Sequence, residues 1–249
     1  MTVIVGILCI DGVVIGADSS ATSCSGNIPI IEQKTKKIDV FDENCTIMAG
    51  TGQVGLRQRF YDIIKSTNKT EIINCFKPIQ VGALFSRKAK LDFSNTFTEH
   101  GQFGALMAFP YKGKGYLCEF SITDFQPELR TGLQCFASMG SGQQITDPFL
   151  ALFKKIFWKD DELPRLQDGV FATVWALNHA IDVNPGGIKE PINVATLIFE
   201  GDTPKVSELS EEEIMEHVSN LDNFMGYMKE YKTRQQDPAQ ATELPQVEE

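Results

Sequence analysis

A threonine stands directly behind the initiator methionine, and an aspartate ends the second apolar run of the chain. Thr2 opens the stretch TVIVGILC, and Asp18 closes the stretch VVIGAD. If Met1 is removed, the α-amine of Thr2 becomes a base of near-neutral pKa within reach of the hydroxyl group of the same residue. Such a residue can attack a carbonyl carbon. Many chains also begin Met-Thr without any catalytic use of the threonine, so the hypothesis needs support further along the sequence.

A carboxylate at the end of an apolar strand is costly to bury unless it meets a cation. The segment EQKTKKIDV supplies three candidate partners for Asp18, namely Lys34, Lys36 and Lys37. On a strand, Lys36 and Lys37 point to opposite faces, so only one of these two could reach the aspartate. The alternative interpretation of Asp18 is a strand-end residue that makes a turn or a cap.

Several motifs together resemble the catalytic β-type subunits of proteasomes and their bacterial relatives, which are N-terminal nucleophile hydrolases. The motifs are the opening block MTVIVGILCIDGVVIGADSSAT, then KKI, IMAGTG, SMGSGQ and HAIDVNPGG. The likeness covers roughly residues 2–199. It implies an α+β fold of the four-layer αββα sandwich type, a threonine endopeptidase activity, and no metal or organic cofactor. It also implies a homo-oligomeric ring that acts on peptides or unfolded proteins.

The resemblance assigns roles to the residues of the first motifs. Thr2 matches the nucleophile, Asp18 and a lysine match the pair that manages its proton, and Gly50 matches the donor to the oxyanion. Counting directly from the threonine favours Lys34 as this lysine. Since the family lysine is usually followed by Val or Ile and often preceded by Lys, we expect Lys37 instead. A strand-to-helix turn would also require a glycine at position 50.

Two later motifs carry the residues that would hold the amine of the nucleophile. Ser141 resembles the serine that hydrogen-bonds this amine, and Asp182 resembles the aspartate that orients it. A Gly-Ser turn and a helix C-terminus are the alternative interpretations. The chain departs from the family at Pro185, where a serine is usual, and at Ser20, where an arginine is common. These departures leave room for an inactive, scaffold-forming member.

Three residues are expected to contact the substrate. Ala21 and Thr22 match the strand that pairs with an extended peptide through main-chain hydrogen bonds. Met48 falls near the primary specificity pocket, where a methionine would favour an apolar side chain before the scissile bond.

Hydrophobic periodicity predicts the elements that position these residues. We expect strands over 2–9, 13–18, 36–52 (two strands), 103–110, 115–122, 133–142 and 191–201, and helices over 53–68, 70–91 (interrupted at Pro78), 146–158, 166–181 and 207–232. Residues 20–35 are expected to form a long loop or an irregular ribbon. The expected helix caps are Thr146 or Asp147, with Pro148 in the first turn, then Asp168 and Ser210.

Composition limits the remaining possibilities. The formal net charge is −10, and no long basic cluster occurs, which disfavours nucleic-acid binding. The six cysteines are scattered without metal-ligand spacing, as expected for free thiols in a reducing cytoplasm. No signal peptide or membrane span is recognisable. We therefore expect a cytoplasmic protein that binds neither a membrane nor a metal.

The expected organisation is a hydrolase domain over residues 1–205, an acidic helical extension over 206–234 and a disordered tail over 235–249. An ATPase unfoldase as a partner is left open. A hydrolase of small amides on the same fold remains an alternative function.

Overall fold

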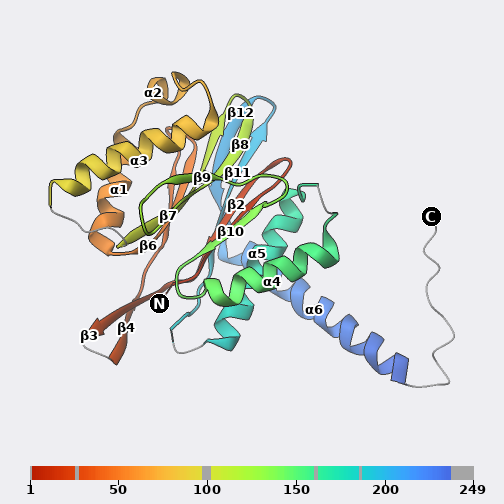
Figure 1. Ribbon diagram of the computed structural model, residues 1–249. Coiled ribbons are helices and arrows are strands. Elements are labelled where there is room, and N and C mark those ends of the chain that lie inside the picture. The colour runs from red at the N-terminus through yellow and green to blue at the C-terminus, as the bar shows by residue number, and fades with distance from the viewer. Residues whose placement is uncertain (1, 26–27, 97–101, 160–161, 185–186, 237–249) are drawn as a thin grey trace.

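The computed structural model describes residues 2–25, 28–96, 102–159, 162–184 and 187–236, and for residues 21–34 it describes the backbone alone. Two five-stranded antiparallel sheets face each other, and helices cover both outer faces (Figure 1). The expected four-layer αββα sandwich is thus confirmed, together with a C-terminal helix.

The first sheet carries the N-terminus of the chain. Its order is β10-β1-β2-β11-β12. The bounds are β1 Ile4–Leu8, β2 Gly12–Ala17, β10 Phe136–Met139, β11 Asn193–Glu200 and β12 Thr203–Glu208. Every residue of β1 and β2 is buried, because one face meets the second sheet and the other meets a helix. This explains why both strands read as continuous apolar runs.

The second sheet has the order β5-β6-β7-β8-β9. Its strands are β5 Ile38–Phe41, β6 Thr46–Gly52, β7 Phe103–Tyr111, β8 Lys114–Phe120 and β9 Pro127–Leu129. The helices on this side are α1 Val54–Ser66, α2 Lys69–Ile73 and α3 Pro78–Ser94. The weak helix expected over 70–91 is therefore two helices, since the second begins at Pro78, which fits the first turn because it needs no N–H partner there.

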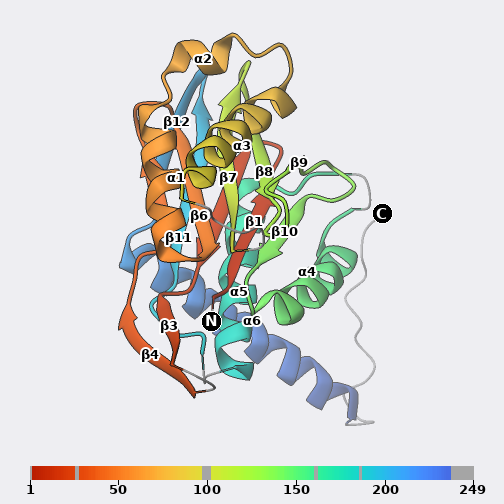
Figure 2. The same cartoon turned by 60° about the vertical axis from the view of Figure 1, so that its left-hand side comes forward.

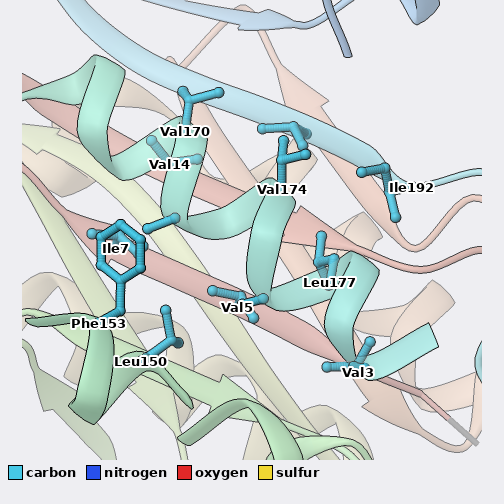
Figure 3. Packing of buried hydrophobic residues seen from close by; sticks show 14 of the residues in the cluster. Val3, Val5, Ile7, Val14, Leu150, Phe153, Val170, Val174, Leu177 and Ile192 are labelled. Carbon is cyan, nitrogen blue, oxygen red and sulfur yellow. The ribbon is translucent and has the colours of Figure 1, made fainter. Parts of the chain in front are cut away.

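Three apolar clusters bind the layers together. One fills the space between the sheets, a second lies between α1, α3 and the second sheet, and the third lies between the first sheet and the helices α4 Gln143–Phe157 and α5 Leu166–Val183. Figure 3 shows the third cluster, in which Val5 and Val14 of the sheet meet Val174 and Leu177 of α5. The last helix, α6 Glu211–Gln236, packs on α5 and then extends beyond the body of the molecule (Figures 1 and 2).

The segment expected as a loop or irregular ribbon is a two-stranded hairpin. β3 Ser20–Ser25 pairs with β4 Ile28–Lys34, with a register shift between Ala21 and Thr22. The hairpin projects from the sandwich near the N-terminus of the chain (Figures 1 and 2).

Two of the predicted helix caps are wrong. Pro148 lies inside α4, which already begins at Gln143. The cap of α5 comes from a distant turn, because Asp11 Oδ1 accepts a hydrogen bond from the Leu166 N–H at 2.8 Å. Asp168 lies in the first turn of that helix. The Ser210 cap is confirmed.

That cap is reciprocal. The Glu213 N–H donates to Ser210 Oγ at 3.2 Å, and Glu213 Oε2 accepts the Ser210 N–H at 2.7 Å.

The strand β12 was not predicted, since its sequence TPKVSE contains a single buried residue.

No helix in the described ranges is long and apolar enough to cross a membrane.

Candidate active site

The loop between β10 and α4 holds the backbone of Thr2. The Thr2 N–H donates to Ser141 Oγ at 3.1 Å, and the Thr2 carbonyl accepts the Gly142 N–H at 3.0 Å. Gly140 has φ of +89°, and a Cβ at this position would lie 2.3 Å from the Thr2 carbonyl oxygen. Only glycine satisfies both conditions. The motif SMGSGQ therefore positions the residue that would be the nucleophile, and its serine is next to the Thr2 nitrogen.

Asp18 follows β2 and is completely buried. Its Oδ1 accepts hydrogen bonds from Lys37 Nζ at 2.5 Å and from the Val3 N–H at 2.9 Å. Its Oδ2 accepts the Ser20 N–H at 3.0 Å and the Ser20 hydroxyl group at 2.7 Å. A buried carboxylate is tolerable only with such a full set of donors. The bond to Val3 also fixes this carboxylate beside the residue that follows Thr2.

Lys37 is the lysine that reaches Asp18. Its side chain is 6% exposed, whereas Lys36 points to solvent and pairs with Glu208 on β12 at 2.5 Å. The side chain of Lys34 lies outside the described part. Burial lowers the pKa of Lys37 from its usual value, Asp18 opposes this effect, and the positive charge of Arg57 adds to it. A lysine with a lowered pKa gives up its proton more readily than a solvated one.

Gly50 lies on β6, where Ala49 is paired with Ile38 of β5. Lys37 directly precedes Ile38 and Gly50 directly follows Ala49, so the pairing of β5 with β6 brings both motifs to the same end of the sheet. A Cβ at Gly50 would lie 2.6 Å from the ring of Phe103. The position is therefore closed to larger residues.

Ser20 is a site residue whose role the sequence did not indicate. Its hydroxyl oxygen lies within hydrogen-bonding distance of two acceptors, Asp18 Oδ2 at 2.7 Å and the Gly187 carbonyl at 2.6 Å, and its single proton can be donated to either. It thereby joins the carboxylate to the segment that follows α5. A serine two residues beyond an aspartate was a usable signal, because such side chains often bond locally. Pro185, the other departure from the family pattern, lies outside the described residues.

Among the described residues, no hydrogen bond or ion pair links the remaining predicted residues to Thr2. Asp182 lies exposed near the end of α5, and no hydrogen bond or ion pair between described residues reaches it. Met48 is fully buried in the cluster under α1 and α3. Ala21 and Thr22 lie on β3 opposite Gln33 and Ile31, and their side chains lie outside the description.

Within the described ranges, no group of three or more His, Cys, Asp or Glu side chains is placed to hold a metal ion.

Comparison with protein families gives one decisive match. The sequence profile of the family described as "Proteasome subunit" matches residues 2–155. The chain belongs to the proteasome subunit family. This stretch includes Thr2, Asp18, Lys37, Gly50 and Ser141. Comparison with curated protein sequences gives no match.

Solved structures similar to this proteasome-family chain include several Anbu proteins. A Gly-1 mutant of Anbu from Hyphomicrobium sp. strain MC1 has a TM-score of 0.68 at 15% identity, covering 92% of this chain and 97% of its own. Anbu from Yersinia bercovieri, described as an ancestral β-subunit, has a TM-score of 0.66 at 12% identity and covers 99% and 100%. The Anbu complex from Pseudomonas aeruginosa, described as a helical assembly, has a TM-score of 0.67 at 12% identity and covers 97% and 100%. At these identities the likeness concerns the fold.

Proposed function

We propose that this chain is a threonine peptidase of the N-terminal nucleophile type, which becomes active when removal of Met1 frees the amine of Thr2. The observation that carries the proposal is the buried ion pair of Asp18 and Lys37, which is bonded to Val3 and therefore adjoins Thr2. Family membership and the Anbu-like fold support it.

In the first half of the reaction, Thr2 Oγ attacks the carbonyl carbon of a peptide bond. The hydroxyl proton passes to the free α-amine or to Lys37, and the Gly50 N–H donates to the oxyanion that forms. A donor aimed at such an oxyanion is worth about 3–4 kcal/mol in the transition state. The tetrahedral intermediate then collapses, the leaving amine takes the proton, and an ester links the acyl group to Thr2.

In the second half, water attacks this ester and releases the peptide acid, while the proton returns to Thr2 Oγ. Asp18 keeps Lys37 in place through both halves, and Ser20 holds Asp18. Ser141 holds the Thr2 nitrogen. Asp182 is the proposed partner of that serine, and Ala21 and Thr22 are the proposed contacts of the substrate backbone.

We further propose that the subunits form a homo-oligomer, by analogy with the helical assembly described for the Pseudomonas aeruginosa complex. The substrates are peptides or unfolded proteins, and the compartment is the cytoplasm, where five described free cysteines would stay reduced.

The test is intact-mass spectrometry of the purified chain before and after treatment with a peptide epoxyketone. This reagent requires both the hydroxyl group and the free amine of an N-terminal threonine. We expect a mass without Met1 and one inhibitor adduct that maps to Thr2. Retention of Met1 without an adduct would exclude the peptidase and favour a scaffold subunit. An adduct without cleavage of any peptide in a fluorogenic panel would favour a hydrolase of small amides.

A further inference from the structure

A second ion pair lies beside the first. Arg57 on α1 and Asp39 on β5 are joined by a contact of 2.5 Å between Nη2 and Oδ2. Asp39 follows Lys37 by two residues, and side chains at this spacing in an extended segment share a face. The pair therefore belongs to the same surface as the proposed proton-transfer group.

The stem of Arg57 also passes close to Gly50. A Cβ built on Gly50 would lie 3.5 Å from Arg57 Cγ. The charge of Arg57 is close enough to Lys37 to help lower the pKa of that lysine. Arg57 is thus near both the proposed oxyanion donor and the proposed proton carrier.

The two ion-paired side chains remain accessible, unlike their neighbours. Arg57 and Asp39 retain 20% and 19% exposure, whereas Met48 is completely buried and Phe103 is 3% exposed. A substrate side chain that enters beside Gly50 therefore meets charged groups rather than the sulfur of Met48.

Arg57 has hydrogen-bonding capacity left over. Its Nε is buried and has no partner among the described residues. An unsatisfied buried donor is costly, so Asp39 alone does not satisfy the guanidinium group of Arg57. Burial raises the pKa of Asp39 from its usual value, and the charge and hydrogen bond of Arg57 oppose this effect. The positive charge of Arg57 and its incompletely satisfied donors favour an incoming oxygen acceptor over an incoming cation.

We infer that Arg57 determines the specificity of the enzyme, by binding a carboxylate or carboxamide on the substrate residue that precedes the scissile bond. The inference rests on the proposed peptidase function. It predicts a preference for Glu or Gln at this position, which differs from the apolar preference expected from Met48. Asp39 acts as the internal ligand that the substrate displaces.

The test measures kcat/KM on tripeptide coumarylamides that differ only in the last residue, namely Glu, Gln, Leu and Lys. We expect kcat/KM for the Glu and Gln substrates to exceed that for the Leu and Lys substrates by about tenfold or more. A site that hydrogen-bonds a group of the substrate strongly rejects an analogue that lacks this group. Arg57→Leu should abolish this preference, and Asp39→Asn should increase it because Arg57 then has no competing anion. Preference of the wild type for Leu or Lys would overturn the inference.

Arg59→Leu is the matched control, because Arg59 lies on the same helix but pairs with Asp92 of α3. It should leave the order of substrates unchanged. An equal change in the order for Arg57→Leu and Arg59→Leu would mean that a disturbed α1, rather than a contact with the substrate, sets the preference.

A binding measurement separates this inference from the peptidase proposal. Fluorescein-labelled peptides ending in Glu or Leu are titrated into Thr2→Ala, with and without Arg57→Leu, and followed by fluorescence polarisation. Tighter binding of the Glu peptide that depends on Arg57 supports the inference even if the wild type cleaves nothing, which would overturn the peptidase alone. Equal binding of the two peptides overturns the inference, whatever the activity.

Discussion

Lys36 and Lys37 are neighbours in the chain with opposite environments. Lys37 is buried against a carboxylate, whereas Lys36 makes an exposed pair with Glu208. Exposed pairs contribute about 0–1 kcal/mol to stability, but loss of one partner from a buried pair costs about 3–5 kcal/mol because the other charge is left unpaired. The same two lysines therefore offer a site variant and its control.

Lys37→Met should lower kcat about 10²- to 10⁴-fold, the usual range for loss of a proton-transfer group. It should also lower the free energy of unfolding by about 3–5 kcal/mol, since Asp18 is then unpaired. Lys36→Met should change both quantities little. Peptidase assays and urea unfolding of the two variants check this.

The double variant Asp18→Asn/Lys37→Met separates the two effects. The double variant has no buried charge at this site. More than half of the free energy of unfolding that Lys37→Met loses should therefore be regained, while the peptidase activity stays lost. Recovery of activity together with stability would assign Lys37 a structural role only.

Gly140 and Gly113 have similar backbone conformations, with φ of +89° and +75°, but different surroundings. A Cβ at Gly140 meets the Thr2 carbonyl at 2.3 Å, while a Cβ at Gly113 meets nothing within 4 Å. Gly140→Ala should therefore displace Thr2 and abolish the epoxyketone adduct. Gly113→Ala carries the same conformational strain, about 1–2 kcal/mol, without this clash, and should keep the adduct. Adduct formation at the wild-type rate in Gly140→Ala would show that Thr2 does not depend on this loop.

At the scale of the elements, the strands that carry Thr2 and Asp18 were predictable because burial on both faces makes the sequence continuously apolar. Helix ends were predicted less well. Thr146 and Asp147 look like a cap before Pro148, yet α4 begins at Gln143, because the turn made by the SMGSGQ motif starts the helix earlier.

A distant cap such as Asp11 on α5 leaves no local signal, since 155 residues separate the two partners. The same limit applies to the site. The sequence predicted Asp18, and the family pattern favoured Lys37 among three lysines, but the contact between these two side chains is tertiary and appears only in the fold.

The contact of Ser20 with the segment after α5 was not predictable for a similar reason, although its local contact with Asp18 was. One of its two partners, the Gly187 carbonyl, is 167 residues away. The local sequence pattern indicates which residues are candidates for catalysis, and the tertiary fold determines which of these residues contact one another.

At the scale of the whole molecule, stability should depend on pH through thiols buried between the layers. Cys118 lies on β8, fully buried in the cluster under α1 and α3. Burial raises its pKa from 9.0 to about 12. Below about pH 7.5, roughly one unit under the pKa of an exposed thiol, Cys118 is protonated in both the folded and the unfolded chain and makes no pH-dependent contribution.

Above this pH the unfolded chain releases the thiol proton while the folded chain keeps it, so stability falls as pH rises. A full pKa unit corresponds to about 1.4 kcal/mol, and the loss due to Cys118 between pH 9 and pH 10 should be about 1 kcal/mol. The variant Cys118→Ala has no thiol that can ionise at this position. Its cavity penalty is the same at every pH, so the gap in free energy of unfolding between variant and wild type should narrow over this interval.

Urea unfolding at a series of pH values, each with reducing agent present, measures this gap. The lowered pKa of Lys37 acts in the opposite direction, since its unfolded form binds more protons and stability rises with pH. Because Lys37 is present in both proteins, its contribution cancels in the comparison. A gap that stays constant from pH 9 to pH 10 would mean that the Cys118 thiol meets solvent in the folded subunit, and that the second sheet is less tightly covered by α1 and α3 than the packing indicates.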